Sequence, residues 1–304
     1  MHPTSSEQLQ IFLEIATEAA LAAGAVLQGY FGFLNVIVEK GRPGDLVTEA
    51  DKASEAAILN VLSRHLPSHG ILAEESGKLG NTASEYLWVI DPLDGTTNYA
   101  HEYPFFAVSI GLLIAGVPQV GVIFDPFHNE LFRAARGLLA TCNRPTGSQS
   151  RDEGNPPAAL SHRSIQVSQT AELSKSLLVT GFAYDRRETT DNNYAEFCHL
   201  THLTQGVRRS GSAALDLAHV ACGRVDGYWE RGIAPWDIAA GVVLLEEAGG
   251  KVSAYDGSPL DIESGRILAT NGHIHAALSQ ELLHVPSLSV WGNTTNIVSD
   301  RANA

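Results

Sequence analysis

The segment WVIDPLDGTTN, residues 88–98, decides what kind of protein this chain forms. Its apolar start ends abruptly at the carboxylate Asp91. The proline that follows disfavours the α region for Asp91, which places this residue at the extended end of a strand. A second carboxylate, Asp94, stands in the loop after the strand, ahead of Gly95, which lets the backbone approach a ligand closely. A helix beginning near Thr96 would offer free N–H groups to an anion.

This arrangement has two interpretations. Two hard oxygen donors beside an anion cradle are what a divalent metal ion holding a phosphate group requires. Alternatively, the segment is a strand followed by an ordinary polar turn, because Asp-Gly and Asp-Pro are common turn pairs. The rest of the chain decides between the two.

The charge balance of the chain limits its partners. Of 304 residues, 44% are hydrophobic and 18% charged, which is typical of a globular chain with room for one large domain or two small ones. The 34 acidic residues outnumber the 20 basic ones and give a net charge of −14. This balance argues against nucleic acid or an anionic membrane as the main partner. A metal site would neutralise a bound phosphate and would use several of the surplus carboxylates.

Cysteine usage and the N-terminus indicate the compartment. The three cysteines, Cys142, Cys198 and Cys222, are an odd number without C-x-x-C spacing, which disfavours zinc and a disulfide framework. The first ten residues have no basic region ahead of an apolar stretch. We therefore expect no secretory signal and a cytoplasmic location.

One segment has the length of a membrane span. Residues 105–124 contain no charged side chain, and twenty residues are about what a bilayer requires. The sequence Gly116-Val117-Pro118 interrupts this run, and its flanks are rich in valine and isoleucine. A hairpin of two buried strands is the better interpretation.

Apolar periodicity and end signals predict an alternation of helices and strands. Helices are expected over 5–30, 49–66, 194–204, 213–222, 237–248 and 273–283. Strands are expected over 35–39, 71–73, 86–90, 176–180, 226–230, 251–254 and 266–269, with a β meander over 106–134.

These elements suggest one catalytic unit made of two halves. Residues 1–142 form an N-terminal α+β half, and residues 165–285 form a C-terminal α/β half. Between them we expect a mobile surface loop over 143–164, which is longer than an ordinary connection, and residues 286–304 are a polar tail. A functional cleft between the halves is the default expectation.

Acidic residues stand at the ends of several predicted elements, where rigid scaffolds commonly place chemistry. They are Asp51, Glu74, Asp91, Asp94 and Asp237. Taken singly, each has a plainer explanation. A carboxylate in the first turn of a helix stabilises the helix dipole by about 0.3–1 kcal/mol, and a Glu-Glu-Ser sequence fits a solvated turn.

Taken together, the acidic positions and their neighbours resemble the inositol monophosphatase family of Mg²⁺-dependent, lithium-sensitive phosphatases. The resemblance extends over about residues 8–284 and is closest to the bacterial and plastid branch. It rests on the following motifs: Asp45-Leu46-Val47-Thr48 ahead of Asp51, Glu74-Glu75, the Asp91–Thr97 segment, Gly211-Ser212-Ala213-Ala214, Trp229-Glu230, and Trp236-Asp237 followed by Gly249-Gly250.

The resemblance implies roles for individual residues. The first Mg²⁺ would be held by Glu74, Asp91 and the carbonyl of Leu93, and the second by Asp91, Asp94 and Asp237, with two or three ions in the site. Asp51 and Thr96, together with Glu74, would orient and activate the attacking water. The N–H groups of Gly95 and Thr96 would contact the phosphate, and Gly211, Ser212, Ala213 and Glu230 would contact the alcohol part of the substrate. Lys40 matches a lysine near the metal site.

The resemblance also implies a fold and a reaction. The fold would be α+β or α/β, the layered α-β-α-β-α sandwich of the inositol monophosphatase and fructose-1,6-bisphosphatase type, usually a homodimer and inhibited by Li⁺. The substrate would be a small polyol phosphate, first of all myo-inositol 1-phosphate. Fructose 1,6-bisphosphate, histidinol phosphate, galactose 1-phosphate and nucleotide 3′-phosphates are alternatives, and an inactive metal-binding regulatory module is a more remote one. The long loop and the tail depart from the family pattern.

Two other site classes fit less well. A phosphatase of the haloacid dehalogenase type would use Asp91 as the nucleophile. That motif has one residue between its two aspartates, whereas two separate Asp91 from Asp94, and three other carboxylates would have no role. A calcium loop starting at Asp91 has Glu102 at its twelfth position but lacks side-chain oxygens at Leu93 and Gly95.

Overall fold

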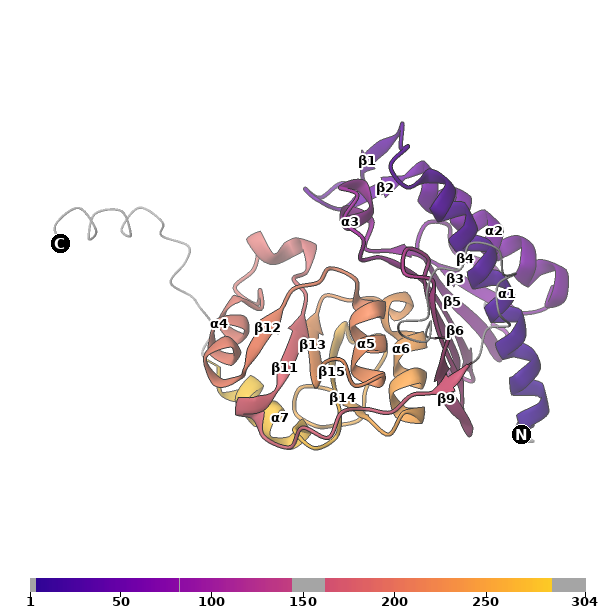
Figure 1. The fold of residues 1–304 in the computed structure, drawn as a ribbon. Coiled ribbons are helices and arrows are strands. Elements are labelled where there is room, and N and C mark those ends of the chain that lie inside the picture. The colour runs from indigo at the N-terminus through magenta and orange to yellow at the C-terminus, as the bar shows by residue number, and fades with distance from the viewer. Residues whose placement is uncertain (1–3, 82, 144–161, 286–304) are drawn as a thin grey trace, which may run out of the picture.

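Sheets and helices alternate in five layers over residues 4–81, 83–143 and 162–285, which the computed structural model describes. Helices α1 (Ser6–Tyr30) and α2 (Glu49–His65) cover the outer face of an eight-stranded sheet (Figure 1). Helices α5 (Ala213–Ala221) and α6 (Pro235–Glu247) lie between this sheet and a five-stranded sheet. Helices α4 (Tyr194–Leu203) and α7 (His275–His284) cover the far side. The expected α-β-α-β-α sandwich is confirmed.

The eight-stranded sheet carries the decisive segment near one side. Its strand order is β10-β9-β8-β7-β6-β5-β3-β4, and all neighbours are antiparallel except β3 and β5. The strands are β3 (Gly70–Ala73), β4 (Gly77–Gly80), β5 (Tyr86–Asp94), β6 (Ala107–Ile114), β7 (Val117–Asp125), β8 (Glu130–Ala135), β9 (Leu138–Cys142) and β10 (Arg163–Ser164). The charge-free segment is therefore the β6–β7 hairpin, as expected.

The five-stranded sheet has the order β12-β11-β13-β15-β14 and mixes parallel with antiparallel pairs. The strands are β11 (Leu177–Thr180), β12 (Gly206–Arg208), β13 (Gly227–Arg231), β14 (Lys251–Ser253) and β15 (Arg266–Thr270). Because successive residues of a strand point to opposite faces, Tyr228 joins the core beneath α5 and α6, whereas Trp229 joins the core beneath α4 and α7.

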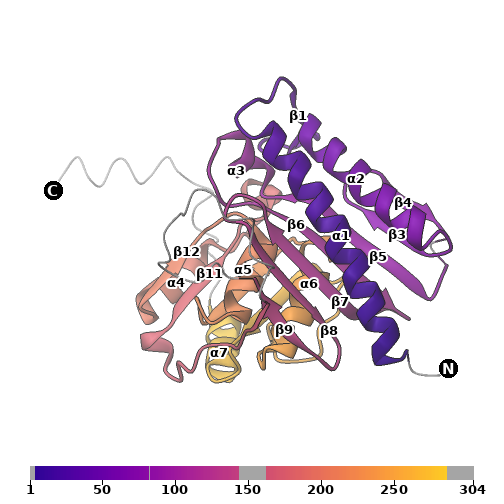
Figure 2. The ribbon, with the colours of Figure 1, turned by 45° about the vertical axis from the view of Figure 1, so that its right-hand side comes forward.

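Smaller elements complete the described chain. Strands β1 (Ile37–Glu39) and β2 (Leu46–Thr48) form a separate two-stranded sheet, and a short helix, α3 (Thr96–Ala100), follows β5. Two 3₁₀ turns, η1 (Leu173–Lys175) and η2 (Tyr184–Arg187), flank β11. Figure 2 shows α1 and α2 running side by side across the face of the large sheet.

Helix α1 combines a capped start with a broad apolar face. The Ser5 hydroxyl accepts a hydrogen bond from the N–H of Gln8, which satisfies one free donor of the first turn. By length and composition α1 is apolar enough to cross a membrane, and half of its most apolar window is buried. The buried side chains, among them Phe12, Ala16 and Leu27, pack in the core between α1, α2 and the large sheet.

Several boundaries differ from the sequence-based expectation. Strand β5 runs on to Asp94 instead of ending near Asp91, for a reason given below. The expected strand over 35–39 is paired only at Ile37–Glu39, and the end of the expected loop over 143–164 contains β10, which pairs with β9. Residues 144–161 of that loop, and the tail over 286–304, lie outside the described residues.

Candidate active site

A β-bulge at the end of β5 brings two carboxylates to one side of the site. Asp91 pairs with Ser109 and Asp94 pairs with Ala107, so β5 has one more residue than β6 between the two pairs. Pro92 has no N–H to contribute to a ladder, and a bulge is where a strand accommodates such a residue. The sequence predicted a loop here because a proline and two acidic residues seldom occur inside a strand.

Hydrogen bonds hold this bulge in shape. The Asp91 carboxylate accepts from the N–H of Leu93 (2.9 Å), and the hydroxyl of Ser54 on α2 donates to the carbonyl of Pro92 (2.7 Å). Ser54 is fully buried, so this bond is protected from water. Both bonds hold the peptide unit between Pro92 and Leu93, directly ahead of the Leu93 carbonyl.

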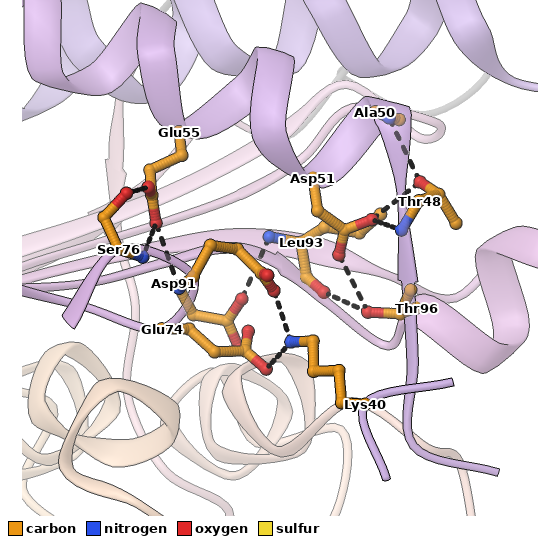
Figure 3. A network of polar contacts seen from close by, with 11 residues as sticks. Lys40, Thr48, Ala50, Asp51, Glu55, Glu74, Ser76, Asp91, Leu93 and Thr96 are labelled. Atoms are coloured by element: carbon orange, nitrogen blue, oxygen red, sulfur yellow. Dashed lines mark hydrogen bonds and ion pairs between the residues drawn. The ribbon is translucent and has the colours of Figure 1, made fainter. Parts of the chain in front are cut away.

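Asp51 and Thr96 lie in direct contact beside the bulge (Figure 3). The Thr96 hydroxyl lies 3.1 Å from Asp51 Oδ1 and 3.0 Å from the Leu93 carbonyl oxygen. The other carboxylate oxygen of Asp51 accepts from the N–H (2.8 Å) and the hydroxyl (2.6 Å) of Thr48. Thr48 caps α2 in turn, so the capping box that Thr48 and Asp51 form also orients the carboxylate. Asp51 is completely buried.

Four further carboxylates face one another across the bulge. Burial raises the pKa of Asp91 well above its ordinary value, and the charges of Glu74, Asp94 and Asp237 raise it further. Burial likewise raises the pKa of Asp94 to about 6, against hydrogen bonds from Ser212 and Ala214 that lower it. Burial and Asp94 raise the pKa of Asp237. Several negative charges so close together are unfavourable without a cation.

Helix starts orient Asp94 and Asp237. Asp94 Oδ2 accepts from the Ser212 hydroxyl (2.6 Å) and from the N–H of Ala214 (2.7 Å), in the first turn of α5. Asp237 Oδ2 accepts from the N–H of Ala234 (2.7 Å), the residue that precedes α6. Each carboxylate thereby has one oxygen engaged with the backbone of a helix start, which fixes the direction of the other.

Lys40 supplies the positive charge nearest to Glu74. Its ammonium group lies 2.9 Å from Glu74 Oε1 (Figure 3) and also contacts Glu75. Burial lowers the pKa of Lys40, but the two glutamates outweigh it and raise the pKa above its ordinary value. Glu55 on α2 accepts from the N–H groups of Glu75 (3.1 Å) and Ser76 (3.3 Å), which fixes the turn after β3.

The donor set suits a hard cation, although its side chains are turned to other partners. No group of three or more His, Cys, Asp or Glu side chains in the described ranges stands arranged around one point as a metal-binding cluster. Glu74 is turned to Lys40, and one oxygen each of Asp94 and Asp237 is engaged with a helix start. Three aspartates, a glutamate and the Leu93 carbonyl are nevertheless the oxygen ligands that Mg²⁺ prefers, and their crowding favours a cation.

Two glycines allow the backbone to come close at the start of α3. Gly95 has φ +97°, and a Cβ there would lie 3.0 Å from the carbonyl oxygen of Phe105 and 3.1 Å from that of Gly211. Asn98 reinforces this junction by donating to the carbonyls of Phe105 (2.7 Å) and Ser210 (2.9 Å). The segment at Gly95, which is expected to contact phosphate, and the segment at Gly211, which is expected to contact the alcohol part of the substrate, are therefore adjacent.

Glu230 lies at the end of β13 near these carboxylates. Burial raises its pKa to about 7, while the hydroxyl of Tyr228 and the charge of Arg209 lower it and Asp94 raises it. Sequence reasoning found Glu230 but missed its partner Tyr228, and it also missed Ser54 and Glu55. The last two were detectable, because they lie three and four positions after Asp51 and so share its face of α2.

A cavity among the described residues lies elsewhere. It has a volume of about 470 Å³ and is lined by Leu139, residues 164–167, Gln169, residues 247–249 and residues 271–273. None of the acidic residues singled out above belongs to its lining. The cavity therefore adds nothing to the carboxylate site.

Comparison with known proteins agrees with this geometry. The model of the inositol monophosphatase family matches residues 8–286. The chain belongs to the inositol monophosphatase family. An inositol-1-monophosphatase of Synechocystis is 62% identical over 282 residues, which are 93% of this chain and 92% of the relative. The chloroplast phosphatase IMPL1 of Arabidopsis thaliana is 39% identical over 89% of this chain and 69% of the relative.

A solved structure extends the agreement to the fold. The inositol monophosphatase from Anabaena is 70% identical, with a TM-score of 0.81, and the match covers 93% of this chain and 99% of that one. These findings confirm the resemblance to the bacterial and plastid branch and the layered fold. They also confirm the expected class of enzyme, a phosphatase of inositol phosphates.

Proposed function

We propose that this inositol monophosphatase family member hydrolyses inositol 1-phosphate to inositol and phosphate in a Mg²⁺-dependent reaction without a covalent intermediate. The observation that carries the proposal is the Thr96–Asp51 contact beside the Leu93 carbonyl, with Asp91, Asp94 and Asp237 crowded next to it. The name of the Synechocystis relative supports the choice of substrate.

Glu74, Asp91, Asp94, Asp237 and the Leu93 carbonyl would hold the metal ions. When bound, Mg²⁺ lowers the pKa of a water molecule and stabilises charge on the phosphoryl group and the leaving oxygen. Filling the site requires Glu74 to exchange the ammonium of Lys40 for the ion. Because Lys40 also contacts Glu75, it has a second carboxylate to remain with.

Thr96 and Asp51 would orient the attacking water and take its proton. The Thr96 hydroxyl has two acceptors close by, so its proton is directed inward and its free lone pair can accept from a water molecule. The buried carboxylate of Asp51 is the acceptor behind it, and burial raises its pKa. A carboxylate with a raised pKa is a better base at neutral pH.

The binding groups would divide the substrate between them. The backbone N–H groups of Gly95 and Thr96, at the start of α3, would receive the phosphate end, and the adjacent Gly211-Ser212 segment would face the alcohol part. Ala213 and Glu230 would contact the alcohol. Phosphate is common to all the alternative substrates, so discrimination between them rests on the residues that contact the alcohol.

A phosphate-release assay with the purified chain tests the proposal. We expect release from inositol 1-phosphate that requires Mg²⁺, and the highest kcat/KM for this ester in a panel with fructose 1,6-bisphosphate, histidinol phosphate, galactose 1-phosphate and a nucleotide 3′-phosphate. No release from any ester would support the inactive regulatory module, and trapping of phospho-Asp91 would support the dehalogenase-type mechanism. Glu230→Gln should reorder the panel more than it lowers all rates together.

The remaining expectations follow from the family resemblance. We propose a homodimer in the cytoplasm, inhibited by Li⁺, with two or three Mg²⁺ ions in each site. An odd number of cysteines without C-x-x-C spacing supports a reducing compartment. Sedimentation velocity measures whether the chain is a homodimer, and a Li⁺ titration of phosphate release measures the inhibition.

A further inference from the structure

We propose that Tyr228 and Gly181 are positioning residues for Glu230, and that together they set the preference of the site for alcohols that present a hydroxyl donor. This inference rests on the proposed function, because it concerns the same site. Neither residue is part of the motifs by which the family was recognised.

The two oxygens of the Glu230 carboxylate differ in their partners. Its Oε2 accepts from the hydroxyl of Tyr228 at 2.7 Å, and Tyr228 is completely buried. Its Oε1 has no hydrogen-bond donor or ion-pair partner among the described residues, yet it is absent from the buried polar atoms that lack a partner. Oε1 is therefore accessible and free to accept from a ligand, while Oε2 is fixed.

Gly181 lies so close to this carboxylate that it leaves no space for a side chain of its own. A Cβ on Gly181 would lie 2.1 Å from Glu230 Oε1 and 2.2 Å from Oε2. Any side chain larger than hydrogen at position 181 would thus displace the carboxylate. The requirement for glycine here comes from Glu230, because Gly181 is not one of the glycines with a positive φ.

Hydrogen bonds of Asn193 keep Gly181 in place. Buried Asn193 donates to the carbonyl of Gly181 (2.7 Å) and to the hydroxyl of Thr180 (2.8 Å), and it accepts from the indole N–H of Trp229 (2.6 Å). Thr180 pairs with Trp229 in the parallel register of β11 and β13. The chain after β11 is therefore tied to β13 at Trp229, the residue that precedes Glu230.

Alternation along β13 makes this arrangement possible. Tyr228 and Glu230 are two positions apart and point to the same face, whereas Trp229 points to the opposite face and reaches Asn193. The indole side of the strand is thus used for fixing the backbone, and the phenol side for fixing the carboxylate.

The charges around Glu230 define a second readout. Burial raises its pKa to about 7, and the hydrogen bond from Tyr228 and the charge of Arg209 oppose this rise. The other charged groups that act on it are Asp94 at the end of β5, Asp216 on α5 and Asp237 on α6. Removing the Tyr228 hydroxyl should raise the pKa of Glu230 and shift the acid side of its pH profile upward.

The chemical consequence concerns the substrate. A carboxylate oxygen held at a fixed place accepts a hydrogen bond from a hydroxyl and repels a second phosphate group. A polyol monophosphate meets both conditions. An aryl phosphate such as 4-nitrophenyl phosphate has no hydroxyl on its leaving group and gains nothing from the fixed carboxylate.

The test compares kcat/KM for inositol 1-phosphate and 4-nitrophenyl phosphate in Tyr228→Phe, with Tyr255→Phe as the matched control. The hydroxyl of Tyr255 is also buried but has no hydrogen-bond partner among the described residues. We expect Tyr228→Phe to lower the ratio of the two kcat/KM values by about tenfold, the effect of one hydrogen bond, mainly through KM. Tyr255→Phe should leave the ratio unchanged. In Tyr228→Phe/Glu230→Gln the ratio should fall no further than in Glu230→Gln alone.

A second pair of variants tests the space. Gly181→Ala should lower the same ratio and the melting temperature, and Gly181→Ala/Glu230→Ala should recover the melting temperature, because the shortened side chain removes the collision. An unchanged ratio in Tyr228→Phe, or an equal loss on both esters, would overturn the positioning role. If the unmodified chain releases phosphate from 4-nitrophenyl phosphate but not from inositol 1-phosphate, the proposed function fails together with this inference. The earlier outcomes concern the positioning role alone.

Discussion

Thr96 and Asp51, which lie 45 positions apart in the chain, meet at 3.1 Å between hydroxyl and carboxylate oxygen. One belongs to the short helix α3 and the other to the first turn of α2, so the contact joins two helix starts. Asp51 performs two tasks there, because one oxygen completes the capping box with Thr48 and the other faces Thr96. The same carboxylate therefore stabilises a helix and orients a candidate catalytic hydroxyl.

This contact predicts a difference between two substitutions of Thr96. Thr96→Val should lower kcat by about 10²–10⁴-fold, the range for loss of a positioned proton acceptor, while Thr96→Ser should retain most of the activity. Thr17→Val is the matched control, since the Thr17 hydroxyl is buried and donates to the Leu13 carbonyl (2.7 Å) on α1, which contributes no residue to the site. Equal kcat values for the valine and serine variants would contradict the role of the hydroxyl.

Asp91→Asn should abolish Mg²⁺-dependent turnover while stabilising the metal-free protein. Its carboxylate is buried among Glu74, Asp94 and Asp237, so removing its charge relieves repulsion in the folded state. In the unmodified chain, Mg²⁺ at about 100 times its Kd should add about 2.7 kcal/mol to the free energy of unfolding. Thermal unfolding with and without MgCl₂ measures both effects.

Asp125→Asn serves as the control for this prediction. Asp125 is also a buried carboxylate, but it accepts from the N–H groups of Phe127 and His128, both at 2.9 Å, at the end of β7. The Asp125→Asn variant should be less stable than the unmodified chain, and Mg²⁺ should still raise its stability. Near-normal kcat in Asp91→Asn would remove Asp91 from the proposed set of ligands.

Sequence reasoning reached the parts of the site that local rules govern. The helix from residue 49, the strand before Asp91 and the helix at Thr96 all follow from neighbouring residues, and each is present. The bulge that carries β5 on to Asp94 was not predicted, because it depends on the register with β6. The contact between Gly181 and Glu230 is equally non-local.

Distances between strands, and between helices and sheets, could therefore not be predicted from the sequence. Alternation along a strand shows that Tyr228 and Glu230 share a face, but not that a hydroxyl and a carboxylate meet there. The family motifs identified the carboxylates. Their partners, such as Lys40 for Glu74, are seen only in the structure. The predicted roles of the individual site residues stay predictions until the variants are measured.

Close approach of α6 to the large sheet predicts a sensitive glycine. Gly111 and Gly121 are paired across β6 and β7, and a Cβ on Gly121 would lie 2.2 Å from the carbonyl oxygen of Ala240. Gly121→Ala should push α6 outward and lower the free energy of unfolding by about 1–3 kcal/mol, the range for overpacking. Because α6 carries Asp237 in its first turn, activity should fall as well.

Gly29→Ala is the matched control for this effect. A Cβ at Gly29 would have no neighbour within 4 Å, and the residue lies inside α1. Because Gly29 lies in the last turn of α1, the substitution should raise the free energy of unfolding by no more than the helix-interior value of about 0.5–1 kcal/mol. Urea unfolding of both variants checks the pair, and a Gly121→Ala variant as stable as the unmodified chain would contradict the close packing.

A buried histidine predicts how stability depends on pH. His275 is 2% exposed, and its two ring nitrogens lie 2.8 Å from the Ser253 hydroxyl and 2.9 Å from the Thr270 hydroxyl. Burial first, and then the charge of Lys251, lowers the pKa of His275 to about 4. The unfolded chain takes up this proton near pH ~6.5, whereas the folded chain does so only near its lowered pKa.

The unfolded state therefore binds more protons between these two values, and the contribution of His275 to stability is lost as the pH falls through this window. Below the folded-state pKa the loss levels off. His275→Gln keeps a donor and an acceptor but does not titrate, so its free energy of unfolding should fall less between pH 7 and pH 4. Urea unfolding at several pH values in a metal-free buffer measures the difference, and parallel curves for the two proteins would show that His275 does not stay neutral in the fold.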